Sequence, residues 1–221
     1  MAKYIVISDF DGSIIPCDMS EKILEYVDCA DIVETLTTSL SNQHITIAQY
    51  MNFVCYALGM EKDLYRCVDP IKIIHKVIEK YNVKVDSNFQ ELEKYCSDKK
   101  YPLYILSGGL KKIIKILLPS FDHSHIFSHD FEVIDEHVKF MKNEKIVPKG
   151  KFIEEQILKY GRKIIFIGDG TSDFTVVKFC HIVFAKRNSV LEMLCVRDKI
   201  NYISFDDFSD INKYLSSQIC L

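Results

Sequence analysis

The chain has 221 residues, a formal net charge of −3 and a hydrophobic fraction of 48%. This length fits one large domain, or one domain with a smaller insert, and can bury a substantial core. The slight negative charge gives no electrostatic basis for binding nucleic acid or an anionic membrane surface. No apolar run reaches the roughly 18 residues needed to span a bilayer, and the run before Asp9 is too short for a signal peptide. We therefore expect a cytoplasmic protein with no membrane partner.

The cysteines do not form a disulfide framework or a metal motif. None of the eight belongs to a C-x-x-C pair, and a chain of this length does not need disulfides to be stable. We expect reduced thiols that are mostly buried as small apolar side chains.

The first half of the chain contains one strand followed only by helices. Residues 3–8, "KYIVIS", predict a buried strand that ends at "DFDGS". Between 15 and 85 the apolar residues recur at helical spacing, with Ser20 expected to cap the first helix and Pro70 to open the last. These predicted helices cover 19–27, 30–40, 45–59 and 70–81.

From about residue 86 onward, short apolar runs alternate with helical patterns, which is typical of parallel β-α units. The predicted strands are 103–107, 163–169, 181–185 and 201–205, and the predicted helices are 109–119, 171–180, 189–197 and 207–217. The segment 130–143 predicts a small hairpin or flap. The sequence thus predicts an α/β fold with a Rossmann-like parallel sheet, its core formed by 1–14 and 86–221, and an all-helical insert at 15–85. Such an insert would lie over the carboxyl ends of the strands, where ligands bind in open sheets of this kind.

Polar, glycine-containing corners follow three of the predicted strands. They are "DFDGS" with Asp9 and Asp11, "SGG" from Ser107, and "GDGTSD" with Asp169 and Asp173. Each corner alone is compatible with an ordinary turn. Because the carboxyl ends of parallel strands meet at one edge of the sheet, the three corners together predict a site.

The residue types at these corners suit a divalent cation and a phosphate group. Asp9, Asp11 and Asp169 offer the oxygen ligands that Mg²⁺ prefers, and a cation would relieve their mutual repulsion. We expect Ser107, with the amides of Gly108 and Gly109, to form a helix N-terminus that attracts phosphate. Either Lys149 or Lys151 could complete the anion site.

Other metal and nucleotide motifs do not fit. A calcium loop starting at Asp9 would need glycine and glutamate where the chain has Ile14 and Ser20, and neither G-x-x-x-x-G-K-[ST] nor G-x-G-x-x-G occurs. The cluster of His123, His125 and His129 lacks the spacing of a structural zinc site, and we interpret it as a polar loop between a helix and a strand.

The three corners and the lysine, in this order, resemble the haloacid dehalogenase (HAD) superfamily of phosphatases. The resemblance consists of D-x-D-G-[ST] at 9–13, the strand-end Ser107, Lys149, and G-D-x-x-x-D at 168–173. It extends over the whole core, and the insert resembles the first-type helical cap of that superfamily. "ILSGG" and "IGDGTSD" are most similar to the phosphoserine-phosphatase-like branch, which also contains a methionine-salvage phosphatase and phosphatases of phosphocholine type.

The resemblance implies the chemistry of the two acids after the first strand. Asp9 would be the nucleophile that forms an aspartyl-phosphate, and Asp11 would protonate the leaving oxygen and then activate water. Asp9, the backbone carbonyl of Asp11, and Asp169 would hold Mg²⁺, with Asp173 orienting the groups around the metal.

The resemblance also implies where the phosphoryl group would bind. Ser107, Gly108 and Lys149 would contact its oxygens. Lys149 is favoured over Lys151 because the superfamily has a K-G pattern before the helix, and Lys149 precedes Gly150.

The chain differs from the phosphoserine enzymes at the positions expected to contact the substrate. Asp18 stands where they have a glutamate, and 45–59, the segment expected to hold their arginine, contains none; Arg66 is the only arginine in the insert. A carboxylate-bearing substrate is therefore disfavoured, and a hydroxyl-rich, keto or amine-bearing phosphomonoester is expected. Phosphoserine phosphatase, a phosphotransferase and a non-catalytic phosphate-ligand sensor remain alternatives, and the sequence does not indicate an oligomeric state.

Overall fold

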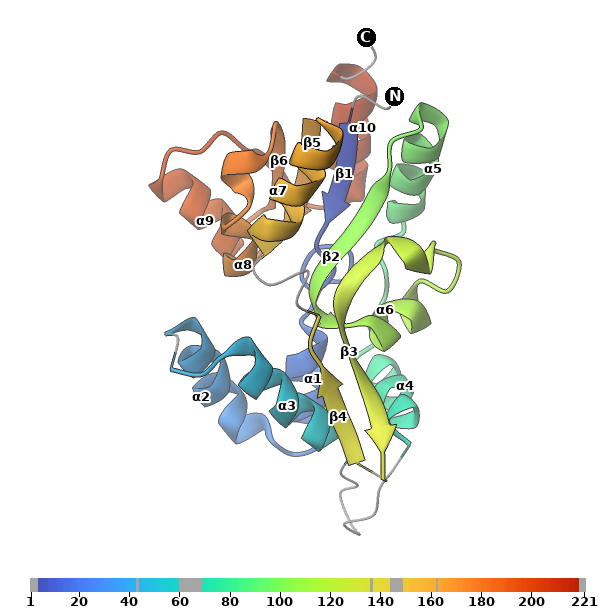
Figure 1. Ribbon diagram of the computed structural model, residues 1–221, viewed down its shortest axis with the longest axis vertical. Coiled ribbons are helices and arrows are strands. Elements are labelled where there is room, and N and C mark those ends of the chain that lie inside the picture. The colour runs from blue at the N-terminus through green and yellow to red at the C-terminus, as the bar shows by residue number, and fades with distance from the viewer. Residues whose placement is uncertain are drawn as a thin grey trace.

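The computed structural model describes residues 4–42, 44–59, 69–135, 137–143, 149–161 and 163–218. Its centre is a seven-stranded sheet with the order β4-β3-β2-β1-β5-β6-β7 (Figure 1). The strands are β1 Tyr4–Ser8, β2 Leu103–Leu110, β3 Ile126–Ile134, β4 His137–Met141, β5 Lys163–Gly168, β6 Ile182–Lys186 and β7 Ile203–Phe205. All neighbouring pairs are parallel except β3 and β4. The predicted α/β fold with a parallel sheet is confirmed.

Helices cover both faces of this sheet because successive side chains of each strand point to opposite faces. Tyr4 and Val6 of β1 belong to one apolar cluster with helices α5 and α10, whereas Ile5 and Ile7 belong to another with α7 (Figure 1). The helices after residue 86 are α5 Phe89–Lys99, α6 Lys111–Leu117, α7 Lys149–Tyr160, α8 Thr171–Phe174, α9 Val190–Arg197 and α10 Phe208–Gln218. No helix within the described ranges is long and apolar enough to cross a membrane.

The segment predicted as an all-helical insert forms four helices at the carboxyl end of β1 (Figure 1). They are α1 Met19–Tyr26, α2 Ala30–Ser41, α3 Ile47–Leu58 and α4 Pro70–Lys80. Pro70 opens α4 as predicted, but the expected capping role of Ser20 is wrong. Asp18 caps α1 instead, because its Oδ1 accepts the backbone N–H groups of Ser20 and Glu21 at 2.7 and 3.2 Å.

The hairpin predicted at 130–143 is present, but its first strand starts earlier. β3 begins at Ile126 and pairs in parallel with β2 before it pairs with β4. The predicted polar loop is therefore wrong for His129, which lies buried in β3 with its Nδ1 accepting the Asn143 N–H at 3.0 Å. β3 joins the sheet from Ile126 onward because its apolar side chains Ile126 and Phe131 are buried in the main cluster.

Two helices differ from their predicted bounds. The helix predicted at 109–119 starts only at Lys111, because β2 continues through Gly108 and Gly109 to Leu110 with a register shift. The helix predicted at 171–180 is one turn, α8, followed by a 3-10 turn at Val177–Phe179.

The six cysteines in the described ranges are free thiols, and three of them, Cys55, Cys96 and Cys195, are buried. Cys67 and Cys220 lie outside the described residues.

Asp86 joins three distant segments at the start of α5. Its backbone N–H donates to Ile14 O at 2.9 Å, and its carboxylate accepts the N–H groups of Asn88 and Phe208 at 2.8 and 3.0 Å. The side chain therefore satisfies free backbone donors near the starts of both α5 and α10.

We predict that Asp86→Ala lowers the free energy of unfolding by about 2 kcal/mol, since it removes hydrogen bonds at the starts of two helices. Urea denaturation measures this change. Asp98→Ala, at an exposed position of α5, is the control and should change stability by less than about 0.5 kcal/mol. Equal losses in the two variants would contradict the capping role.

Candidate active site

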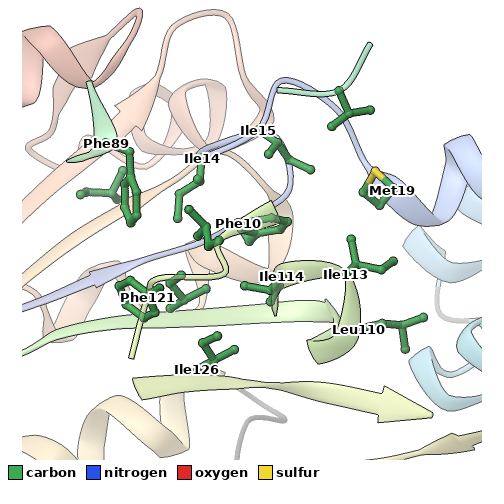
Figure 2. Packing of buried hydrophobic residues seen from close by; sticks show 14 of the residues in the cluster. Phe10, Ile14, Ile15, Met19, Phe89, Leu110, Ile113, Ile114, Phe121 and Ile126 are labelled. Carbon is green, nitrogen blue, oxygen red and sulfur yellow. The ribbon is translucent and has the colours of Figure 1, made fainter. Parts of the chain in front are cut away.

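The loop after β1 is held in place by an apolar side chain between its two acids. Phe10 is buried in the main cluster together with Ile14, facing α6 and β2 (Figure 2). The Asp9 N–H donates to Ile167 O of β5 at 2.8 Å, and the Phe10 N–H donates to Asp9 Oδ1 at 2.7 Å. These contacts fix Asp9 at the edge where β1 and β5 end.

Three carboxylates gather at this edge. Each of Asp9, Asp169 and Asp173 offers one oxygen such that all three atoms lie within 4.8 Å of one another. Asp173 is fully buried, and its Oδ2 accepts the N–H groups of Asp169 and Gly170 at 3.0 and 2.9 Å. The side chain of Asp173, in the one-turn helix α8, therefore folds back onto the end of β5.

Lys149 is the cation in contact with this group. It starts α7, is only 6% exposed, and places its Nζ 2.8 Å from Asp9 Oδ2 and 2.7 Å from Asp173 Oδ1. Burial alone would lower the pKa of Lys149, but the charges of Asp173 and Asp9 raise it above its ordinary value. Lys151 is exposed on α7. The structure thus brings Lys149 to the acids, as the K-G pattern predicts.

The Asp11 carboxylate is not a member of the three-acid group. Its Oδ1 accepts the Met19 N–H at 3.0 Å, and the Ser107 hydroxyl donates to its Oδ2 at 3.5 Å. Burial, followed by the charge of Asp18, raises the pKa of Asp11 to about 8. Asp11 therefore differs from Asp9 in its environment, although only one residue separates them.

The "SGG" corner lies beside Asp11, but it is not a helix N-terminus as expected. Ser107 is buried in β2, and its Oγ accepts the Gly109 N–H at 2.9 Å. A Cβ on Gly109 would lie 2.7 Å from Asp11 Oδ2, whereas one on Gly108 would meet nothing within 4 Å. The backbone at Gly108 therefore borders open space, and Gly109 allows Asp11 to approach the strand.

Among the residues that the structure describes, the three acids outnumber Lys149, the cation that contacts them, and this imbalance fits a divalent metal ion. Burial, followed by the charge of Asp173, raises the pKa of Asp169 to about 7 and also raises that of Asp9. A bound cation would favour the ionised forms of these groups, and three clustered carboxylates supply the oxygen ligands that Mg²⁺ prefers.

Two glycines leave room for carboxylates of the site to lie close to the backbone. One of them, Gly168, was considered in the sequence only as the first residue of the G-D-x-x-x-D motif. Gly12 has a φ of +72°, and a Cβ there would lie 2.1 Å from Asp169 Oδ2. A Cβ on Gly168 would lie 2.5 Å from Asp173 Oδ2. The position of Gly168 directly before Asp169 is the signal that could have identified it.

Asp18, the expected specificity residue, is exposed at the start of α1. It lies near the site, because it directly precedes Met19, whose N–H donates to Asp11 Oδ1. Arg66 lies outside the described residues.

The parallel sheet and the acids at its carboxyl edge define a Rossmann-like α/β protein with a candidate metal site. The family model of haloacid dehalogenase-like hydrolases matches residues 6–178, and the chain belongs to this family. The predicted family and the predicted phosphatase class are confirmed.

Two relatives align with nearly the whole chain. Polyol phosphate phosphatase PYP1 of Saccharomyces cerevisiae is 26% identical over 96% of this chain and 92% of its own length. A 2-hydroxy-3-keto-5-methylthiopentenyl-1-phosphate phosphatase of Lysinibacillus sphaericus is 23% identical over 96% of this chain and 93% of its own length. Among solved structures, a substrate-bound phosphoserine phosphatase has a TM-score of 0.72 at 18% identity, over 97% of this chain and 98% of that one. That likeness supports the fold.

We predict that Gly12→Ala lowers phosphatase activity by roughly 10²-fold, since its Cβ would displace Asp169 from the acid cluster. Hydrolysis of an aryl phosphate measures the effect. Gly161→Ala is the matched control, because Gly161 has a φ of +58° but open space around its Cβ position. The Gly161→Ala variant should have a similar backbone strain but retain activity. Equal losses of activity in both variants would show that the effect of Gly12→Ala comes from backbone strain and not from the displacement of Asp169.

Proposed function

We propose that the protein is a Mg²⁺-dependent phosphomonoesterase that hydrolyses a small phosphorylated metabolite through an aspartyl-phosphate on Asp9. The contact of buried Lys149 with both Asp9 and Asp173, beside a separately held Asp11, carries this proposal. A nucleophilic carboxylate, a fixed positive charge and a second acid are the groups that phosphoryl transfer to an aspartate needs.

The reaction has two steps. A carboxylate oxygen of Asp9 attacks phosphorus, the ester bond to the leaving group breaks, and Asp11 gives its proton to the departing oxygen. Asp11, now a carboxylate, takes a proton from water as that water attacks the aspartyl-phosphate, which releases inorganic phosphate and restores Asp9. Positioned proton transfer of this kind contributes roughly 10²–10⁴-fold to a rate.

Asp9, Asp169 and the backbone carbonyl of Asp11 would hold Mg²⁺, and Asp173 orients this region through the N–H groups of Asp169 and Gly170. The ion would neutralise charge on the phosphoryl oxygens.

Lys149, Ser107 and Gly108 would bind the phosphoryl oxygens. Lys149 already lies 2.8 Å from the nucleophile, so it can contact a group bound to Asp9. Ser107 lies next to Asp11, and the open space at Gly108 leaves its backbone accessible.

The residues 15–85 would form a cap that encloses the substrate, with the core at 1–14 and 86–221. The structure adds the β3–β4 hairpin to the neighbourhood of this cap, since Gly59 at the end of α3 lies against Val138 of β4.

The substrate would be a polyol or keto phosphate rather than phosphoserine. Two relatives are named for a polyol phosphate and a keto phosphate. The acidic Asp18 and the absence of arginine from 45–59 disfavour a substrate carboxylate.

We predict that Asp9→Asn reduces phosphate release from an aryl phosphate to the uncatalysed rate, since the amide is a poor nucleophile. A coupled phosphate assay measures turnover, and an unchanged thermal midpoint checks the fold. Asp98→Asn should keep full activity. Turnover by the Asp9→Asn variant at more than a few per cent of the wild-type rate would contradict the role of Asp9 as the nucleophile.

We predict that removing divalent metal with EDTA abolishes turnover and that Mg²⁺ restores it, because the clustered acids repel the substrate phosphate without a cation. Isothermal titration of the stripped protein with Mg²⁺ should show binding, weakened at least tenfold in Asp169→Asn. Full activity in EDTA would exclude the metal role.

A further inference from the structure

The first turn of α1 donates its backbone N–H groups to two carboxylates, one of which belongs to the proposed active site. A helix leaves its first N–H groups without partners inside the helix. In α1, Asp18 Oδ1 accepts the second and third of these groups, from Ser20 and Glu21, at 2.7 and 3.2 Å. The first, from Met19, donates to Asp11 Oδ1 at 3.0 Å. The start of α1 therefore holds the Asp11 side chain as well as its own cap.

Buried side chains fix the place where α1 begins. Met19 is 2% exposed and packs in the main apolar cluster (Figure 2). Ser20 is also buried, and its hydroxyl lies 3.8 Å from the sulfur of Met51 in α3. These contacts anchor the helix, but they do not determine the direction in which the Met19 N–H points.

The direction of that N–H depends on Asp18. The peptide plane that carries the Met19 N–H lies between Asp18 and Met19, so it turns with the ψ angle of Asp18. Asp18 has a ψ of 119°, the extended conformation of an N-cap residue. Its side-chain hydrogen bonds to Ser20 and Glu21 require this conformation and so hold the peptide plane in place.

The contact with Met19 determines which oxygen of Asp11 faces the proposed phosphate site. Because Oδ1 accepts the Met19 N–H, Oδ2 is the oxygen beside the "SGG" corner, where the Ser107 hydroxyl donates to it at 3.5 Å. A Cβ on Gly109 would lie 2.7 Å from the same oxygen. In the proposed reaction, the proton that Asp11 gives to the departing oxygen is therefore held on Oδ2.

We propose that Asp18 is a positioning residue for this proton transfer. By capping α1, it keeps the Met19 N–H on Asp11 Oδ1 and thereby keeps Asp11 Oδ2 directed at the departing oxygen. The inference rests on the proposed function of the site. This contribution is separate from substrate selection, for which Asp18 is also the expected residue, because it requires no contact between Asp18 and the substrate.

The test compares phenyl phosphate with 4-nitrophenyl phosphate, which have similar shapes but leaving oxygens of different basicity. The phenol oxygen needs a proton to depart, whereas the less basic nitrophenol oxygen departs as an anion. The value of kcat/KM reports the steps up to this departure and excludes hydrolysis of the aspartyl-phosphate. In the Asp18→Ala variant, kcat/KM should fall roughly 10-fold for phenyl phosphate and less than about 2-fold for 4-nitrophenyl phosphate, because only the first ester depends on a well-placed acid.

Three further variants separate positioning from charge and from loss of stability. Asp18→Asn removes the charge but keeps an oxygen that caps a helix equally well, so the ratio of kcat/KM for the two esters should stay at its wild-type value. Asp69→Ala is the matched control, because Asp69 caps α4 by accepting the Ile71 N–H at 3.0 Å, and it should leave the ratio unchanged. In an Asp11→Asn background, Asp18→Ala should not change the ratio further.

Equal losses for both esters in Asp18→Ala would overturn the proposal, since a residue that only selects or stabilises does not respond to the leaving oxygen. A change of the ratio in Asp18→Asn as large as in Asp18→Ala would also overturn it, because the charge and not the cap would then be responsible.

Hydrogen exchange of the Met19 amide provides a measurement that is independent of turnover. Asp18→Ala should speed this exchange at least about 5-fold, the factor for one lost N-cap, and Asp69→Ala should leave it unchanged. Unchanged exchange in Asp18→Ala would contradict the proposal. If the wild type hydrolyses neither ester, the proposed function fails, and the exchange rate still decides whether Asp18 holds the Met19 N–H on Asp11.

Discussion

The contact of the buried Lys149 ammonium with Asp9 and Asp173 is the constraint on which the rest of the site depends. A buried charge is tolerated only when it is paired and hydrogen-bonded, and Lys149 has both partners at 2.7–2.8 Å. These three residues come from the end of β1, the start of α7 and the short helix α8. The sheet order places β1 beside β5, so the ends of these segments meet.

This pairing also sets the charge of the site. Lys149 contacts two of the three clustered carboxylates, and burial, followed by the charge of Asp173, raises the pKa of Asp9 and Asp169. The excess negative charge would attract a metal cation and repel a substrate phosphate. Binding of the metal ion and binding of the phosphate would therefore depend on one another. Asp11 is outside the cluster, held by Met19 and Ser107, and this separation allows two nearby acids to have different chemical roles.

In the proposed function, the helices α1–α4 would add the part of the site that contacts the remainder of the substrate. α1 begins after Asp18, which directly precedes Met19, the residue whose N–H donates to Asp11. The core would bind the phosphate group, which all candidate substrates share. In the proposed function, discrimination among them would therefore depend on residues outside the phosphate site, and Asp18 at the start of α1 is the expected one.

The sequence by itself determined the fold class and the family, because local apolar periodicity and short motifs carry that information. It also predicted the candidate site residues Asp9, Asp11, Lys149, Asp169 and Asp173. It misplaced His129 and the end of β2, where buried contacts with neighbouring strands override local polarity and glycine content. Only the tertiary structure showed that Asp173 offers a carboxylate oxygen to the cluster of Asp9 and Asp169 while the Asp11 carboxylate is held by Met19 and Ser107, and that a Cβ on Gly12 would collide with Asp169. These arrangements depend on which strand ends and loops lie side by side, and long-range packing of this kind is decided only when the chain folds.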